Sequence, residues 1–241
     1  MKTPFQVVGH RGFPQRYPEN SLQGIVAAAQ AGAPFVELDV QISRDGVPVV
    51  FHDEVLDRVT EKDGEIWEYS VSELSQMSCH EPQRFQEAFN PTPISTLQEV
   101  CEALVDFDVH VFVEVKEKSL DHISREDMLA QIVSATASIM SRITVISFDI
   151  DMLYTAERVF PVGWGLREFD DAHLQKAKKL QPQVLIFDVT RLSDDAVLWP
   201  GPWQWFLYDI VDLEKALFWT AKGASYIETW DVKALLSKAR V

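Results

Sequence analysis

The sequence contains few cysteines and no long apolar segment, and both absences limit what it can encode. Cys79 and Cys101 form no CxxC motif, so we expect two buried, reduced thiols rather than a disulfide. No segment approaches the about 18 consecutive apolar residues of a membrane-spanning helix, and the first dozen residues hold no apolar stretch of signal-peptide length. We therefore expect a cytoplasmic protein without a membrane span.

Positive charge is also scarce. The chain has 22 Lys and Arg against 37 Asp and Glu, a net charge of −15, and its pI is near 4.7. Such a surface repels nucleic-acid phosphates, so nucleic acid is not the expected partner. A small phosphate-bearing ligand would need a local positive site. The 46% hydrophobic and 24% charged residues exclude a disordered or collagen-like chain.

Short apolar segments alternate with amphipathic segments along the 241 residues. Many are nearly continuous Val, Ile, Leu and Phe, which is typical of parallel strands that are buried on both faces. Alternating strands and helices favour a parallel α/β sheet. The nine strand candidates are residues 5–9, 35–40, 47–51, 109–115, 143–148, 162–166, 184–189, 205–210 and 225–229.

Nine strands are one too many for an eight-stranded barrel, but the second and third candidates are separated only by residues 41–46. A parallel crossover needs a dozen residues or more, and Asp45-Gly46 is a turn signal. We therefore expect a hairpin-like or sharply bent pair there and a distorted (β/α)8 barrel, which is typically about 250 residues long. The predicted organisation is one domain over residues 1–241, with a loop insertion at about 54–93. A doubly wound open sheet is the alternative, and no GxGxxG motif supports it.

Helix signals fall between the strand candidates. Thr96 and Glu99 form a capping box, and Ser21 precedes a helix over residues 22–31 that Gly32 ends. Ser124 can cap a helix over residues 128–140, and Asp212 can cap one over 213–222. Within the insertion, residues 70–78 are a short helix candidate.

Polar clusters stand at the carboxyl ends of four strand candidates, where barrel enzymes carry their active sites. Side chains two residues apart on a strand point to the same face, so Glu37 pairs with Asp39 and Glu114 pairs with Lys116. If that face is the interior, three carboxylates converge with Lys116 as the one buried basic partner. The clusters are His10-Arg11-Gly12 with Pro18-Glu19-Asn20, Glu37-Leu38-Asp39, His52-Asp53 and Glu114-Val115-Lys116.

Converging carboxylates are costly unless a cation compensates them. Oxygen-only ligands favour one divalent metal ion, Mg²⁺ or Ca²⁺, over Zn²⁺. A single Glu-x-Asp pair is more often a solvated strand face, and a single histidine more often has a structural role. We keep the structural interpretation for His80, His110, His122 and His173. Solvated strand faces and structural histidines do not readily explain why four otherwise apolar strands all end in charged residues.

These motifs, in this order and spacing, resemble the glycerophosphodiester phosphodiesterase family, in particular its cytosolic bacterial members. The likeness extends over essentially the whole chain and is strongest over residues 5–60 and 93–120. Further matching segments are Asp45-Gly46 with Pro48, Pro93 to Glu99, Ser147-Phe148-Asp149 and Gly165-Leu166.

The resemblance implies a distorted barrel with a loop insertion and a metal-dependent phosphodiesterase. Its substrates would be glycerophosphodiesters, the deacylated phospholipid headgroups, and its products sn-glycerol 3-phosphate and an alcohol. The implied roles are catalysis by His10 and His52 as an acid–base pair, metal binding by Glu37, Asp39 and Glu114, phosphate binding by Arg11 and Lys116, and support of the first loop by Glu19 and Asn20.

Two residues depart from the family pattern on the substrate side. Tyr208 stands where a tryptophan is usual, and Trp230 where an aspartate is usual. Both are candidate substrate-binding residues, and Trp230 could form an apolar wall with Trp199, Trp203 and Trp205. The departures leave open a lysophospholipid or another phosphodiester as the substrate. A catalytically silent binding barrel is a third hypothesis, and the oligomeric state is open.

Overall fold

Nine strands form one sheet in the computed structural model, which describes residues 4–238. All nine strand candidates are confirmed, with ends shifted by a few residues at most. Residues 1–3 and 239–241, which the one-domain prediction includes, lie outside the described part. The strands are β1 (Gln6–Gly9), β2 (Phe35–Ile42), β3 (Pro48–Val50), β4 (His110–Val115), β5 (Ile143–Ser147), β6 (Val162–Gly165), β7 (Val184–Asp188), β8 (Gln204–Tyr208) and β9 (Ala224–Thr229).

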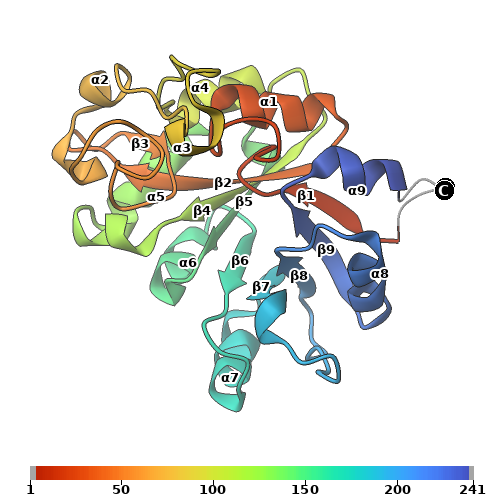
Figure 1. Ribbon diagram of the computed structural model, residues 1–241. Coiled ribbons are helices and arrows are strands. Elements are labelled where there is room, and N and C mark those ends of the chain that lie inside the picture. Colours follow the sequence, from red (N-terminus) through yellow and green to blue (C-terminus); the bar gives the residue numbers. More distant parts are fainter. Residues whose placement is uncertain (1–3, 239–241) are drawn as a thin grey trace.

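Eight of these strands are parallel and close into a barrel (Figure 1). The neighbours run in the order β1, β9, β8, β7, β6, β5, β4 and β2, and pairing between β1 and β2 closes the ring. The remaining strand, β3, pairs antiparallel with the far end of β2, so that Val40 lies opposite Val50. The predicted barrel with a hairpin-like extra strand is therefore confirmed, and the open doubly wound sheet is not found.

The two faces of each strand differ in what they contact. Val36, Leu38 and Val40 of β2 belong to the apolar layer between the barrel and its surrounding helices. The alternate residues point inward, and below the site a separate interior cluster fills the barrel. That cluster comprises Val8, Phe112, Ile146, Val184, Ile186, Phe206 and Tyr226. Inward-facing carboxylates above it are therefore supported on an apolar floor.

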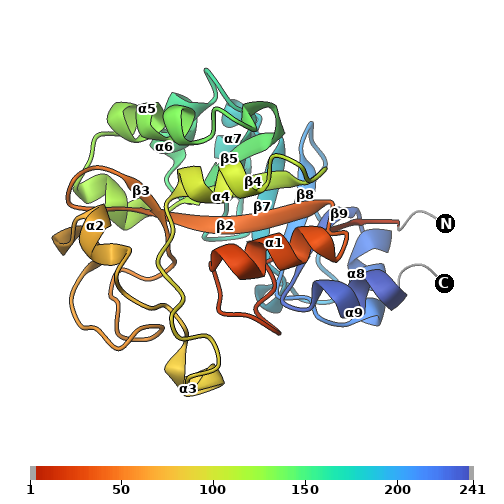
Figure 2. The ribbon, with the colours of Figure 1, turned by 90° about the horizontal axis from the view of Figure 1, so that it is seen from above.

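Helices surround the barrel (Figures 1 and 2). Ser21 and Thr96 accept hydrogen bonds from backbone N–H groups of the helices that they cap, as predicted. Ser124 caps a helix that begins at Arg125 and ends at Ala135, so the predicted range of 128–140 is shifted. The helices are α1 (Leu22–Gln30), α4 (Leu97–Ala103), α5 (Arg125–Ala135), α6 (Ile150–Ala156), α7 (Asp171–Leu180), α8 (Leu213–Ala221) and α9 (Val232–Lys238).

The segment between β3 and α4 forms the expected insertion on the barrel. It contains only short helices, η1 (Ile66–Glu68), α2 (Val71–Leu74) and α3 (Pro82–Phe85). Of these, α2 corresponds to the helix candidate over residues 70–78, and η1 and α3 have no counterpart among the sequence predictions. Figure 2 shows α3 at the end of the insertion away from the barrel. A second apolar core holds the insertion together, formed by Val49, Phe51, Leu56, Val59, Ile66, Leu74, Met77, Cys79 and Ile94.

Cys79 and Cys101 are both buried free thiols. Burial raises the pKa of each thiol to about 12. Between residues 4 and 238, every helix is too short or too polar to cross a bilayer.

Candidate active site

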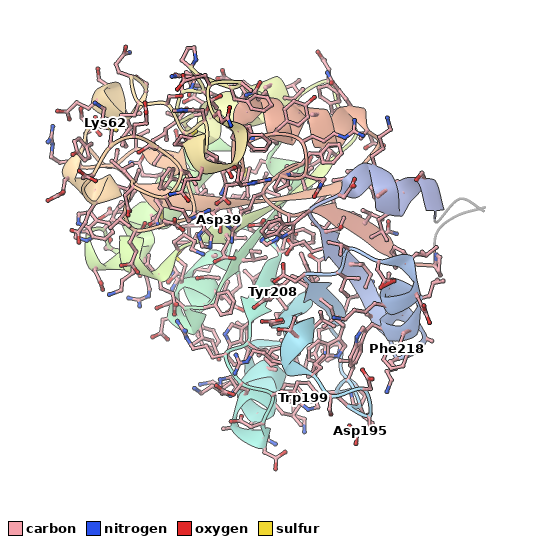
Figure 3. All side chains as sticks on the ribbon, viewed as in Figure 1. Asp39, Lys62, Asp195, Trp199, Tyr208 and Phe218 are labelled. Atoms are coloured by element: carbon pink, nitrogen blue, oxygen red, sulfur yellow. The ribbon has the colours of Figure 1, made fainter. Side chains whose placement is uncertain are left out.

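A pocket of about 250 Å³ opens at the carboxyl ends of the barrel strands. Eight of the predicted site residues line it: His10, Arg11, Glu37, Asp39, His52, Glu114, Lys116 and Tyr208, with Trp230 as a ninth at its rim. Figure 3 shows Asp39 and Tyr208 toward the middle of the barrel. The fold thus brings together predicted site residues that are more than 200 positions apart in the chain, such as His10 and Trp230.

Three carboxylates converge on one side of this pocket. Glu37 and Asp39 are 3% and 2% exposed, and together with Glu114 they offer oxygen atoms within 4.8 Å of one another. Burial, followed by the negative charges of Asp39 and Glu228, raises the pKa of Glu37 well above its usual value. A metal ion would relieve this repulsion, and an oxygen-only donor set is the type that Mg²⁺ and Ca²⁺ bind. The predicted ligand residues therefore fit a divalent ion.

Two cations stand against these carboxylates. Lys116 Nζ lies 2.7 Å from Glu114 Oε1 and 3.3 Å from Asp39 Oδ1, and Arg11 Nε lies 3.2 Å from Asp39 Oδ2. Although burial favours the neutral acid, Lys116 and Arg11 hold the pKa of Asp39 below its usual range. The expectation of Lys116 as the one buried basic partner is therefore wrong. The fold of the first loop brings in Arg11 as a second partner, which strand spacing could not reveal.

Backbone conformation fixes this loop. Arg11 and Asn20 both have positive φ angles, 51° and 55°, which are costly for residues other than glycine. The Arg11 N–H donates to Glu37 Oε2 at 2.9 Å. Asn20 Nδ2 donates to Asp39 Oδ2 at 2.8 Å, and its Oδ1 accepts from the Asp39 N–H at 3.1 Å. Asn20 thus supports Asp39 from behind the pocket.

His10 is the more buried of the two predicted catalytic histidines. Its side chain is 12% exposed, with Nδ1 at 3.7 Å from Asp209 Oδ1 and Nε2 at 3.8 Å from Glu228 Oε2. Burial and the positive charge of Arg11 lower its pKa to about 3. The indole of Trp230 meets the His10 ring edge-on, with the ring centres 5.9 Å apart. His10 is therefore held in its neutral form.

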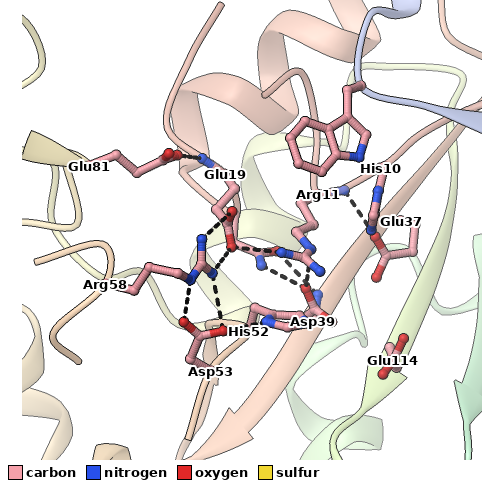
Figure 4. A network of polar contacts seen from close by, with 12 residues as sticks. His10, Arg11, Glu19, Glu37, Asp39, His52, Asp53, Arg58, Glu81 and Glu114 are labelled. Atoms are coloured by element: carbon pink, nitrogen blue, oxygen red, sulfur yellow. Dashed lines mark hydrogen bonds and ion pairs between the residues drawn. The ribbon is translucent and has the colours of Figure 1, made fainter. Parts of the chain in front are cut away.

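His52 belongs to a chain of polar contacts that leads away from the pocket (Figure 4). Its Nδ1 lies 2.5 Å from Asp53 Oδ1, and Arg58 donates to Asp53 Oδ2 through Nε at 2.5 Å. Arg58 also contacts Glu19, which in turn accepts from Arg11 Nη1 at 2.9 Å. Glu19 does not line the pocket but joins the loops that carry Arg11 and His52.

The opposite side of the pocket is apolar. The ring of Phe148 covers Gly165 so closely that a Cβ atom there would lie 2.9 Å from it. Further apolar surface comes from Ile146, Ile186 and Phe206.

At the rim of the pocket, Trp230 is 37% exposed, and its Nε1 donates to Asp209 Oδ1 at 3.2 Å. Burial and the charge of Asp188 raise the pKa of Tyr208.

The expected tryptophan wall is wrong for three of its four members. Trp203 and Trp205 both donate from Nε1 to the backbone carbonyl of Trp199, and Trp199 stacks on Phe169 with ring centres 4.2 Å apart. These rings pack outside the barrel, because Trp205 alternates with the inward-facing Phe206. Figure 3 shows Trp199 well apart from Asp39.

Sequence reasoning missed three charged residues of the site. Glu228 lines the pocket at 4% exposure, and the signal for it was present, since it stands at the end of an apolar strand as Glu37 and Glu114 do. Asp209 also lines the pocket, and it has a positive φ of 63°. Arg58 lies in the insertion and carried no such signal. The other four histidines, His80, His110, His122 and His173, are not among the lining residues.

Glu228 also belongs to a second group of possible ligands. Atoms of His10, Glu37 and Glu228 lie within 4.8 Å of one another. Glu37 is common to this group and to the carboxylate group. Oxygen ligands alone define the carboxylate group, whereas the second contains an imidazole nitrogen, which suits transition metals better than Mg²⁺ or Ca²⁺.

Comparisons with known proteins agree with this geometry. Residues 10–199 match the model of the glycerophosphoryl diester phosphodiesterase family. A glycerophosphodiester phosphodiesterase of Caldanaerobacter subterraneus is 31% identical over 64% of this chain and 63% of its own length. Human glycerophosphodiester phosphodiesterase 1 is 32% identical over 45% of this chain and 33% of its own length. The chain thus aligns with less than two thirds of these curated relatives.

Solved structures share the fold over nearly the whole chain. A phosphodiesterase of Oleispira antarctica, solved in complex with sn-glycerol 3-phosphate, has a TM-score of 0.84 at 24% identity and covers 98% of this chain and 97% of its own. A putative glycerophosphoryl diester phosphodiesterase of Silicibacter pomeroyi has a TM-score of 0.82 at 20% identity, covering 99% and 95%. At these identities the likeness establishes the barrel fold.

Proposed function

The chain belongs to the glycerophosphoryl diester phosphodiesterase family, and from this premise we propose that it hydrolyses glycerophosphodiesters to sn-glycerol 3-phosphate and an alcohol. The observation that carries the proposal is the convergence in one pocket of two histidines, two cations and the carboxylate group of Glu37, Asp39 and Glu114. The related Oleispira enzyme was solved with sn-glycerol 3-phosphate bound, which supports the same product here. A pocket of about 250 Å³ suits a small-molecule substrate.

We assign a divalent metal ion, Mg²⁺ or Ca²⁺, to Glu37, Asp39 and Glu114. When bound, such an ion neutralises phosphate oxygens and lowers the pKa of a bound hydroxyl or water. The ion pair between Lys116 and Glu114 and the hydrogen bond from Asn20 to Asp39 hold two of these carboxylates in place. Such supporting contacts orient ligands and tune their affinity.

Arg11 and Lys116 would bind the phosphate. The planar guanidinium of Arg11 suits phosphate oxygens, while Lys116 supplies a compact charge. Charge that develops on the phosphorus oxygens in the transition state is stabilised by cations already fixed by Glu19, Asp39 and Glu114. Because these side chains are held before the substrate binds, little reorganisation opposes the reaction.

His10 and His52 would transfer the protons. Because His10 is neutral, one of its ring nitrogens carries a free lone pair, and we assign it as the general base that removes the proton of the nucleophile. His52 Nδ1 lies 2.5 Å from Asp53 Oδ1, and this contact orients the ring. We therefore assign His52 to protonation of the leaving alcohol, which would place the two histidines on opposite sides of the scissile bond.

Metal-dependent turnover tests this proposal. Glycerophosphocholine and glycerophosphoethanolamine should yield sn-glycerol 3-phosphate with Mg²⁺ or Ca²⁺, and a chelator should stop the reaction. His10→Ala and His52→Ala should each reduce kcat by about 10²- to 10⁴-fold. His173→Ala is the control, because His173 contacts Asp170 and Trp164 rather than the pocket. Normal turnover by the His10→Ala, His52→Ala double variant would refute the assigned roles.

The apolar side of the pocket supports a second candidate substrate. Phe148, Phe206 and the exposed Trp230 offer surface that could bind the chain of a lysophospholipid. A strong preference for acylated over deacylated substrates in a panel would favour this candidate. A binding role without catalysis would instead show as phosphate-ester binding with no turnover of any diester.

The buried free thiols fit a reducing compartment, so we also propose that the protein acts in the cytoplasm. Fractionation of cells that produce the protein tests this directly. Recovery in a secreted or membrane fraction would contradict the assignment.

A further inference from the structure

A third group of potential metal ligands lies in the insertion, apart from the barrel pocket. Glu61, His80 and Glu87 offer ligand atoms that all lie within 4.8 Å of one another. None of the three lines the pocket at the barrel mouth. They come from three separate loops of the insertion, whose sequence separation gave no sign that they would meet.

Backbone contacts fix the positions of these loops. The N–H of Glu81 donates to the Val59 carbonyl, which places the segment around His80 beside the segment that leads to Glu61. Thr60 is buried and donates through Oγ1 to the Leu56 carbonyl. Glu87 follows α3 in a turn closed by the Asn90 N–H, which donates to the Glu87 carbonyl. The three ligand positions are therefore set by the local fold.

The ring of His80 has a free nitrogen lone pair, as a metal ligand requires. It is fully buried, and its Nδ1 lies 3.3 Å from the backbone carbonyl of Ser78. Since a carbonyl only accepts, Nδ1 carries the hydrogen and Nε2 carries a lone pair. Nε2 is buried without a hydrogen-bond partner. An unpaired buried acceptor is costly, and a carbonyl on the other ring nitrogen is the usual arrangement behind a metal-bound histidine.

Glu61 and Glu87 supply the charge that such a site needs. Both residues are exposed, so their side chains can close over an ion bound at Nε2. Two carboxylates and one neutral imidazole balance a divalent charge. The nitrogen donor favours Zn²⁺ over Mg²⁺ and Ca²⁺, which prefer oxygen ligands alone.

We propose that Glu61, His80 and Glu87 form a structural Zn²⁺ site that links three loops of the insertion. The site is chemically distinct from the all-carboxylate group at the barrel mouth. Binding stabilises the folded insertion, because the ligands are brought together only in the folded state. The segment from His80 to Glu81 also reaches the active site, since Glu81 Oε1 accepts from the N–H of Glu19 at 2.6 Å.

Zn²⁺ titration of the full chain tests this site. The variant Glu37→Gln, Glu114→Gln removes competition from the barrel mouth and serves as the parent. In calorimetry the parent should bind one Zn²⁺ per chain, should not bind Mg²⁺ at the same site, and should melt at a higher temperature with Zn²⁺. Adding Glu61→Gln and Glu87→Gln should weaken Zn²⁺ binding by at least about tenfold and remove the thermal shift.

Three controls complete the experiment. Glu54→Gln with Asp57→Asn makes the same change of charge in exposed positions of the insertion and should leave Zn²⁺ binding intact. His80→Gln should abolish binding, and because His80 is buried the exposed Glu61→Gln, Glu87→Gln pair decides the case if this variant fails to fold. Equal Zn²⁺ affinity of the parent and that pair, or no Zn²⁺ binding by the parent, would overturn the proposal, whether or not the protein hydrolyses diesters.

Discussion

Arg58 donates two hydrogen bonds to the carboxylate of Glu19, at 2.9 and 2.5 Å. The same guanidinium contacts Asp53, the partner of His52. Glu19 in turn accepts from Arg11. One residue of the insertion therefore connects the loop with a predicted phosphate-binding residue to the loop with a predicted catalytic histidine, which gives the insertion a part in shaping the site.

Replacing Arg58 should impair catalysis more than folding. Arg58→Met removes the link between Glu19 and Asp53, so Arg11 and His52 lose part of their fixed geometry, and kcat/KM should fall by about 10- to 100-fold. The Arg58 side chain is 44% exposed, so its loss should change the melting temperature little. Steady-state kinetics and thermal unfolding measure both effects.

Arg44, in the turn between β2 and β3, offers a matched control beside the insertion. It is also an exposed arginine in ion-pair contact with a glutamate, Glu73, but it does not reach the pocket. Arg44→Met should leave kcat/KM unchanged. Similar losses of activity in both variants would show that the Arg58 link has no specific effect on the site.

Removal of one carboxylate should affect the metal-free and the metal-bound protein in opposite ways. Glu37 is buried close to Asp39 and Glu228, and these charges raise its pKa, so Glu37→Gln should maintain or raise the melting temperature without metal. A metal ion at a hundredfold excess over Kd stabilises the folded state by about 2.7 kcal/mol. The variant should lose most of this gain with Mg²⁺ or Ca²⁺. An undiminished metal-dependent shift would exclude Glu37 as a ligand.

A single methyl group should alter substrate binding on the apolar side of the pocket. In Gly165→Ala the new Cβ would lie 2.9 Å from the Phe148 ring, so the ring must move within the pocket. We expect KM to rise about tenfold, with a smaller change in kcat, because Phe148 does not reach the charged side. Gly165→Ala combined with Phe148→Leu should recover most of the affinity. If the double variant did not recover affinity, the rise in KM would come from a distortion of β6 rather than from the displaced Phe148 ring.

The buried thiols should make stability depend on alkaline pH. Burial raises the pKa of Cys79 and Cys101 to about 12, whereas an unfolded thiol titrates near 8.5. Above about pH 9 the unfolded chain loses protons that the native chain keeps, so the free energy of unfolding falls as pH rises. Each thiol should contribute about 1.4 kcal/mol per pH unit.

Urea unfolding at pH 8 and pH 10 under reducing conditions measures this slope. The Cys79→Ala, Cys101→Ala variant should show a smaller decline, since its unfolded state has no thiol to titrate. An equal decline in both proteins would mean that the native thiols ionise as freely as unfolded ones.

Much of the barrel could be predicted because its strands carry strong local signals. Buried parallel strands are continuous apolar runs, and a charged residue at the end of such a run stands out, as Glu37 and Glu114 do. Glu228 has the same signal but was overlooked. The short loop around Asp45-Gly46 was enough to predict the antiparallel β3, which the structure confirms.

The remaining features depend on contacts between distant loops. Arg58 and His80 lie in a polar insertion without periodicity, so nothing local indicates that Arg58 reaches Glu19 or that His80 meets Glu87. Whether a tryptophan faces the pocket could not be predicted either. The sequence around Trp199 and Trp230 does not show which side of the barrel each side chain contacts. The roles of the individual site residues stay predictions until they are tested.

The closure of the barrel has a consequence for protein synthesis. Strand β1, which leads to His10, pairs on one side with β9, the last strand of the barrel in chain order. Pairing with β2 on its other side involves only Val8 with Phe35 and Gly9 with Val36. The predicted catalytic and metal-binding residues all lie within the first half of the 241 residues. The strand that leads to His10, however, gains its second neighbour only when β9 has been made. A nascent chain therefore cannot assemble the complete site before β9 has been synthesised.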